Sequence, residues 1–144
     1  MTPRGARTTP GGPAQGLRHW NKALRFRDAA EANARAGLWD GAVSNAILAA
    51  IQAASAATIH FSSHRSSSQN HEDAIFLLEQ ATALDAGVRA RFLLHFQALL
   101  SLKSLVQYSD RAYEPAEGER AIQHLERALA SLAGLAKTAG WPAP

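Results

Sequence analysis

A polar segment between two apolar stretches holds the residues best suited to chemistry. It runs from Ser62 to Asn70, reads Ser-Ser-His-Arg-Ser-Ser-Ser-Gln-Asn, and stops just before His71. Serine hydroxyls, the Arg65 guanidinium and the free N–H groups at the start of a helix all donate hydrogen bonds to anions. Asn70 is a suitable N-cap for a helix that begins near His71. The segment therefore predicts an anion site in which Arg65 supplies the charge.

Three histidines in this part of the chain also raise the question of a metal. His60 and His64 share a helix face if the helix reaches that far, and His71 follows seven residues later. Zinc needs a third and usually a fourth ligand, which His71, Glu72 or Asp73 could supply. The alternative is that these are ordinary polar residues at a helix end and in a loop. We favour that alternative and expect no metal or other cofactor.

Other kinds of catalytic site leave no trace in the sequence. There is no phosphate-cradling glycine loop, no serine nucleophile elbow and no pattern of parallel strands to hold either. His19 and His124 stand alone, and we expect both to be surface residues. We expect Asp110, Arg111 and Tyr113, in the turn before the last helix, to form structural pairings rather than a site.

The composition limits the cellular setting. The chain has no cysteine, which excludes disulfides, thiolate metal sites and cysteine nucleophiles. Residues 1–16 are rich in Pro, Gly, Thr and Arg and contain no apolar run of the kind found in a signal peptide. A small protein stabilised by packing alone is typical of the cell interior. We therefore expect a cytoplasmic protein.

The net charge of +3 comes from the N-terminal end of the chain. Arg4, Arg7 and Arg18 supply the excess, and from His19 onward twelve Lys or Arg balance twelve Asp or Glu. Electrostatic binding of DNA or RNA needs cations clustered on the folded body. Composition alone thus gives little support for a nucleic-acid patch, beyond nonspecific help from a basic tail.

The elements that must position these residues are all predicted to be helices. Residues 1–14 contain three Pro and three Gly among Thr and Arg, and we expect them to form a disordered basic arm. A helical domain then covers residues 15–140, and a short tail occupies 141–144. Apolar spacing, with Gly37 and Gly140 as stops and Pro115 as a start, predicts helices at about 15–36, 40–62, 71–84, 86–108 and 115–140. The predicted fold class is all-α, an antiparallel bundle of four to five helices without a β-strand.

The helix at 40–62 is the most informative of these elements. From Ala42 to Ile59 there are eighteen residues without a charge, which is long enough to cross a membrane. Eight of the eighteen are Ala, however, and polar residues such as Asn45 and Gln52 interrupt the run, so transfer into lipid is unfavourable. A central helix surrounded by its neighbours explains the pattern better, with Asn45 or Gln52 hydrogen-bonded inside the bundle. We therefore expect no membrane association.

Several features follow one another in a recognisable order. The turn Gly37-Leu38-Trp39-Asp40 precedes the Ala-rich helix, and the polar loop leads into His71-Glu72-Asp73-Ala74, with Leu77-Leu78 one turn later. Later come Leu102-Lys103-Ser104-Leu105-Val106-Gln107-Tyr108, an acidic turn, and a closing helix that contains Glu119, Ala121, Leu125, Ala128 and Leu129. In this order of elements the chain resembles the HEPN family of nucleotide-binding helical bundles, over about residues 18–137.

The resemblance implies a function related to RNA or nucleotides. HEPN proteins are typically homodimers in toxin–antitoxin pairs and defence-type systems, some of them beside a nucleotidyltransferase partner, and many are metal-independent ribonucleases. The active members carry an Arg, then four to six residues, then a His. In such a pair the His moves a proton and the Arg stabilises phosphate charge while the RNA 2′-hydroxyl attacks.

Arg65 and His71 fit this pattern, with five intervening residues, although they lie earlier in the chain than the usual motif. The resemblance then assigns Arg65 to the phosphate and His71 to proton transfer. Ser66, Asn70 and Lys103 become supporting phosphate contacts. The prediction is a catalytic or phosphate-binding site that needs no metal.

Two other pairs of residues fit the motif less well. Arg89 and His95 have the same spacing, but they lie in an apolar helix, and we expect His95 to be a packed helix residue. In family members whose fourth helix ends like this one, the Arg and His of the motif fall where this chain has Lys103 and Tyr108. Tyrosine is a poor general base near neutral pH. This departure supports an alternative function, a noncatalytic dimeric module that binds a protein partner.

Overall fold

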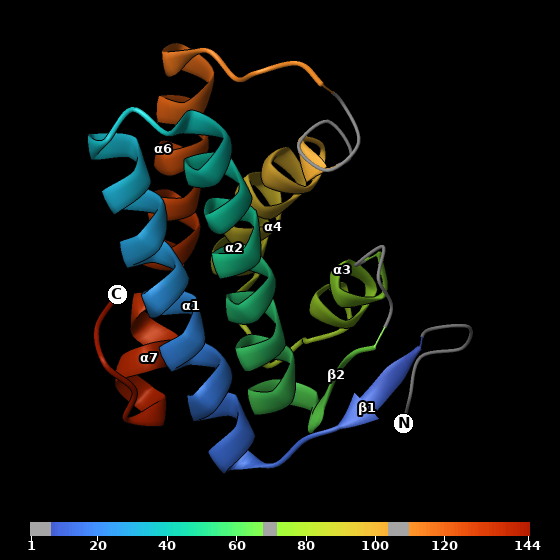
Figure 1. The fold of residues 1–144 in the computed structure, drawn as a ribbon. Helices are drawn as coiled ribbons and strands as arrows, with labels where there is room; N and C mark the ends of the chain where they lie inside the picture. The colour runs from blue at the N-terminus through green and yellow to red at the C-terminus, as the bar shows by residue number, and fades with distance from the viewer. Residues whose placement is uncertain (1–6, 68–71, 104–109) are drawn as a thin grey trace.

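The computed structural model describes residues 7–67, 72–103 and 110–144, which form a bundle of helices with one small strand pair (Figure 1). The elements are β1 (Thr8–Pro10), α1 (Pro13–Arg35), α2 (Trp39–Ser62), β2 (His64–Ser66), α3 (Glu72–Glu79), α4 (Ala86–Leu100), α6 (Pro115–Ser131) and α7 (Ala133–Ala139). The predicted all-α class and helical bundle are confirmed. Helices α1 and α2 form an antiparallel pair, and their three-residue turn contains Gly37 at φ +73°.

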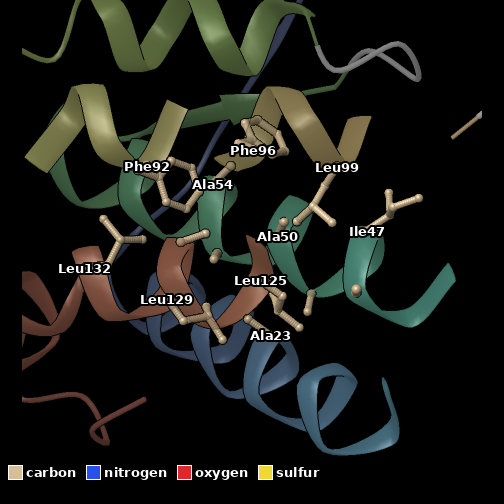
Figure 2. Packing of buried hydrophobic residues seen from close by; sticks show 14 of the residues in the cluster. Ala23, Ile47, Ala50, Ala54, Phe92, Phe96, Leu99, Leu125, Leu129 and Leu132 are labelled. Atoms are coloured by element: carbon tan, nitrogen blue, oxygen red, sulfur yellow. The ribbon is translucent and has the colours of Figure 1, made fainter. Parts of the chain in front are cut away.

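Helix α2 is the centre of the bundle. Its alanines from Ala42 to Ala57 are fully buried. In Figure 2, Phe92 and Phe96 of α4 lie on one side of Ala54, and helices α6 and α1 lie on its other side. Alanine lets the neighbouring backbones approach closely. The helix is long and apolar enough to cross a membrane by composition, yet 72% of its most apolar window is buried by the rest of the chain, as expected for a core helix.

Several helix ends differ from the predicted ones. Helix α3 stops at Glu79, because the chain turns so that Leu84 packs into the protein and Asp85 caps α4 by accepting from the Val88 N–H at 3.0 Å. Helix α4 ends at Leu100 rather than near residue 108. Residues 104–109 lie outside the described residues. The predicted last helix is divided into α6 and α7 at Leu132, whose φ of −96° and ψ of 6° depart from helical values.

The strand pair corrects two further expectations. Thr8–Pro10 pair antiparallel with His64–Ser66, so the chain does contain β-structure, and Thr8 to Pro10 are ordered rather than part of a disordered arm. The left-handed Ser63, at φ 57°, ends α2, and its carbonyl accepts from the Gly11 N–H at 2.9 Å. Helix α1 then starts at Pro13, a favourable first-turn residue. The remainder of the predicted arm, residues 1–6, lies outside the described residues.

The C-terminal segment closes against α1. The rings of Trp20 and Trp141 stack with centroids 5.5 Å apart, and the Trp20 Nε1–H donates to the Pro142 carbonyl at 2.8 Å. Trp20 is fully buried as a result. The predicted tail at 141–144 is therefore part of the packed structure.

Candidate phosphate site at Arg65

Strand β2 positions Arg65 immediately after the end of the central helix. Arg65 pairs with Thr9 of β1, and its side chain is half-buried. Its Nη1 donates to the Ser66 carbonyl at 3.2 Å. A guanidinium has five N–H donors, of which this bond uses one. The strand therefore holds a cation in place and leaves it donors suited to a phosphate.

The serine neighbours differ in exposure. Ser66 is 8% exposed, which leaves little room for direct contact with a phosphate, whereas Ser67 is exposed. The Ser67 N–H donates to the Arg7 carbonyl at 3.0 Å, and the Arg7 N–H donates to Asp73 Oδ2 at 2.8 Å. These two bonds tie the strand pair to the first turn of α3. Because that turn carries two carboxylates, Glu72 and Asp73, the positive charge of this site comes from Arg65 rather than from the helix end.

Of the other predicted members of the site, Ser66 and Lys103 have described positions. His71 and Asn70 lie outside the described residues, as does Tyr108. Lys103 follows three residues after the end of α4, and that end of α4 lies well away from β2 in Figure 1. The structure thus places Arg65 and Ser66 side by side on β2 and puts Lys103 elsewhere.

The candidate metal ligands make other contacts. His64 Nδ1 lies 2.9 Å from the Ser62 carbonyl, so this nitrogen carries the proton and donates it. The exposed His60 ring meets the Trp141 ring edge to face, with centroids 5.7 Å apart. Among the residues with described positions, no three His, Cys, Asp or Glu side chains are grouped so as to hold a metal. His71, the third member of the predicted cluster, is not among those residues.

Arg89 and His95 do not form a pair, despite their spacing. The Arg89 guanidinium donates from Nη1 to the Ala81 carbonyl at 2.9 Å and so stabilises the turn between α3 and α4. His95 instead meets His124 of α6, with the two Nδ1 atoms 3.0 Å apart. Burial lowers the pKa of His95, and the nearby His124 and Arg127 lower it further. His95 is half-buried in the bundle, as expected, but the expectation that His124 stands alone is wrong.

The His95–His124 pair cannot be recognised in the sequence, because the two residues are 29 positions apart. Spacing shows that each side chain lies on one face of a helix, but it does not show which faces meet. The expectation that His19 stands alone is also wrong: its Nδ1 lies 2.6 Å from Oε1 of Gln52, which thereby has the hydrogen-bond partner expected for it.

The turn before α6 is structural, as predicted for Arg111 and Tyr113. Arg111 Nη2 forms an ion pair with Glu117 at 2.7 Å, and this hydrogen bond lowers the pKa of the Glu117 carboxyl. The Tyr113 N–H donates to Asp40 Oδ1 at 2.8 Å, and its hydroxyl donates to the Leu102 carbonyl at 3.1 Å. Burial raises the pKa of the Tyr113 hydroxyl, which keeps this group protonated as a donor.

Comparison with known protein families identifies the domain to which most of the chain belongs. The sequence model of the HEPN domain matches residues 17–135, which is most of the chain and nearly the range of the resemblance noted above. Comparisons with curated proteins and with solved structures find no match. The match runs from within α1 to within α7 and includes Arg65 and the His95–His124 pair. The chain therefore belongs to the HEPN domain family.

Proposed function

We propose that this HEPN-domain protein interacts with RNA or a nucleotide and holds a phosphate group at Arg65. The observation that carries the proposal is the position of Arg65, fixed on β2 beside the exposed Ser67. Membership of the HEPN family supports the same conclusion. A charge-assisted hydrogen bond to phosphate is about twice as strong as a neutral one, so this single side chain can dominate binding.

In its catalytic form, the proposal makes the protein a metal-independent ribonuclease. His71 would take the proton from the RNA 2′-hydroxyl, whose oxygen attacks the adjacent phosphorus to form a 2′,3′-cyclic phosphate. The P–O5′ bond breaks at the same time, and the 5′-oxygen leaves as a hydroxyl after taking a proton from water. Arg65 would stabilise the charge on the phosphate during this exchange. The five-residue interval between Arg65 and His71 supports this assignment. The enzyme would act as a homodimer in the cytoplasm, within a toxin–antitoxin or defence-type system.

RNA binding and cleavage by the Arg65→Ala variant test the proposal. We expect the affinity for a short single-stranded RNA to fall about 10- to 100-fold, because a hydrogen bond to a charged group contributes about 1.5–3 kcal/mol. Fluorescence anisotropy measures this loss. Arg35→Ala, which removes an exposed cation in the last turn of α1, is the matched control and should bind like the wild type. Equal affinities for all three proteins would exclude Arg65 as the phosphate contact.

Cleavage separates the catalytic form from simple binding. With EDTA present, wild-type protein should still cut RNA, while His71→Ala should bind it without cutting. If the wild type binds RNA and leaves it intact, the ribonuclease assignment is wrong and the binding function remains.

A noncatalytic interaction module is the second candidate, favoured by two observations. Lys103 and Tyr108 stand where active members carry the Arg and His of the motif. Leu94 and Leu38 are 63% and 59% exposed, so each can contribute apolar area to an interface with another protein. Such a module would form a homodimer or bind a partner protein, for example a nucleotidyltransferase. Two results together would exclude this candidate. Light scattering would show a monomer, and an immobilised nucleotidyltransferase from a neighbouring gene would not retain the protein.

A further inference from the structure

His95 and His124 face each other across the contact between α4 and α6. Their Nδ1 atoms are 3.0 Å apart and their ring centroids 5.3 Å apart. Both side chains are half-buried, so each ring keeps access to solvent. Arg127, one turn after His124, is exposed and acts electrostatically on His95. Two imidazoles and a guanidinium therefore share one patch of surface, which we call the histidine seam.

The bond between the two rings holds one proton. One Nδ1 donates and the other accepts, so at least one ring must lack a proton at this nitrogen. If both rings are protonated, two N–H donors point toward each other, and the pair needs an acceptor. An oxyanion can accept from both rings and from the planar guanidinium of Arg127.

The charges that act on His95 are positive. His124 and Arg127 both lower its pKa, and among the described residues no carboxylate raises it. Helix α4 contains no Asp or Glu, and the part of α2 from Ala42 to Ile59 is uncharged. The carboxylate of α2, Asp40, lies in the first turn of that helix and accepts from the Tyr113 N–H, so neither helix directs an anion at the seam.

The carboxylates on the remaining neighbours of α4 are directed elsewhere. On α6, Glu117 is bound to Arg111, and Glu126 lines a hollow with Arg27 on the side of α1. Glu119 is five residues before His124, on a different face of the helix. The acidic residues of α3 exert no charge effect on His95. They are Glu72, Asp73 and Glu79.

We propose that His95, His124 and Arg127 form a binding site for a phosphate group or a similar tetrahedral oxyanion, whose binding adds a second proton to the histidine pair. A divalent metal is the other ligand that two facing imidazoles suit. Arg127 repels a cation, however, and the described residues provide no third ligand. The site uses different elements from Arg65, so it does not depend on the function proposed above.

Sulfate is the sharpest first probe, because it stays a dianion across the pH range in which histidine titrates. The titration is done with the Arg65→Ala protein, so that a second anion site at Arg65 does not contribute. We expect sulfate to shift the imidazole NMR signals of His95 and His124. Between about pH 7.5 and pH 5.5, affinity should rise up to about tenfold per pH unit, the slope for uptake of one proton per anion.

Two variants and one control assign the effect to the seam. His95→Asn keeps a hydrogen-bonding group opposite His124 but cannot gain a proton, so it should weaken sulfate binding and flatten its pH dependence. Arg127→Gln should lower the affinity at every pH and keep the slope. His19→Asn changes a histidine on α1 that bonds to Gln52, and it should behave like its parent.

The outcomes decide the proposal. Absence of any sulfate-induced shift at His95 and His124, or an equal effect on distant histidines, would overturn it. Binding of zinc with loss of the sulfate response would also overturn it, because the seam would then be a cation site. Titration with inorganic phosphate, with AMP and with a short RNA distinguishes the source of the phosphate group: tighter binding of one of the last two identifies a nucleotide or an RNA chain.

Discussion

At the scale of single residues, the histidine seam makes folding stability depend on pH. The pKa of His95 in the folded protein is below its ordinary value of 6.5. His95 therefore binds a proton more tightly in the unfolded chain than in the folded protein. The stabilising effect of neutral His95 is present above pH 6.5 and is lost as the pH falls toward the folded-state pKa. We expect the Tm to drop between about pH 7.5 and pH 5.5, less in His95→Asn than in the wild type.

Circular dichroism melts in buffers free of phosphate and sulfate measure this difference, since anions at the seam would mask it. His19→Asn serves as the control for loss of a histidine outside the seam. Parallel pH profiles for the wild type and His95→Asn would contradict the prediction.

The candidate residues show what sequence alone can reveal at this scale. Arg65 is recognisable as a candidate from its residue type and its serine neighbours, because these properties are local. His95 and His124 were not found as a pair, because their contact depends on how α4 and α6 pack. Ser66 was selected for its hydroxyl, yet strand pairing buries it to 8% exposure. Burial of a single loop residue depends on the tertiary fold, which no local pattern contains.

At the scale of elements, Gly118 controls how closely α6 approaches the start of α2. A Cβ at this position would overlap Cε3 of Trp39. We therefore expect Gly118→Ala to destabilise the protein by about 1–3 kcal/mol, the usual range for overpacking, despite the better helix propensity of alanine. Urea unfolding followed by circular dichroism measures the change.

Gly134 in α7 is the matched control, because a Cβ there meets nothing within 4 Å. Gly134→Ala should stabilise the protein by up to about 1 kcal/mol through helix propensity alone. Opposite signs for the two glycines are the expected result. Two equal changes would mean that Trp39 does not limit the approach of α6.

The helices themselves were predictable, while several of their ends were not. Apolar spacing located every long helix, because each one buries a continuous face. The end of α3 depends on contacts across the following turn, such as the bond from Arg89 to the Ala81 carbonyl, which joins residues eight apart. The strands were missed because each has three residues and neither shows an alternating apolar pattern. Their pairing is specified by the left-handed turn at Ser63 and the bond to Gly11.

At the scale of the whole molecule, the C-terminal segment completes the core around α1. Trp141→Ala removes the ring that stacks on Trp20 and opens the hollow beside Gly16 and His60. We expect a loss of about 1–3 kcal/mol, below the cost of a fully buried aromatic because Trp141 is half-buried. The emission of Trp20 should shift to longer wavelength as water reaches it.

Thermal unfolding and tryptophan fluorescence test this prediction together. Trp39 adds a constant background, since it begins α2 while Trp141 lies by His60 near the other end of that helix. Thr138→Ala, an exposed change on α7, is the control. Unchanged stability and emission in Trp141→Ala would show that the terminal segment is not needed to cover α1.

The tight connection at Gly37 has a consequence for the order of folding. In the described part of the chain, the largest interface between two elements joins α1 to α2, and only three residues link these helices. Contacts between segments close in sequence form quickly, because little chain entropy is lost in closing a short loop. We therefore expect this hairpin to form early as the nucleus, while α4, α6 and the strand pair add to it later.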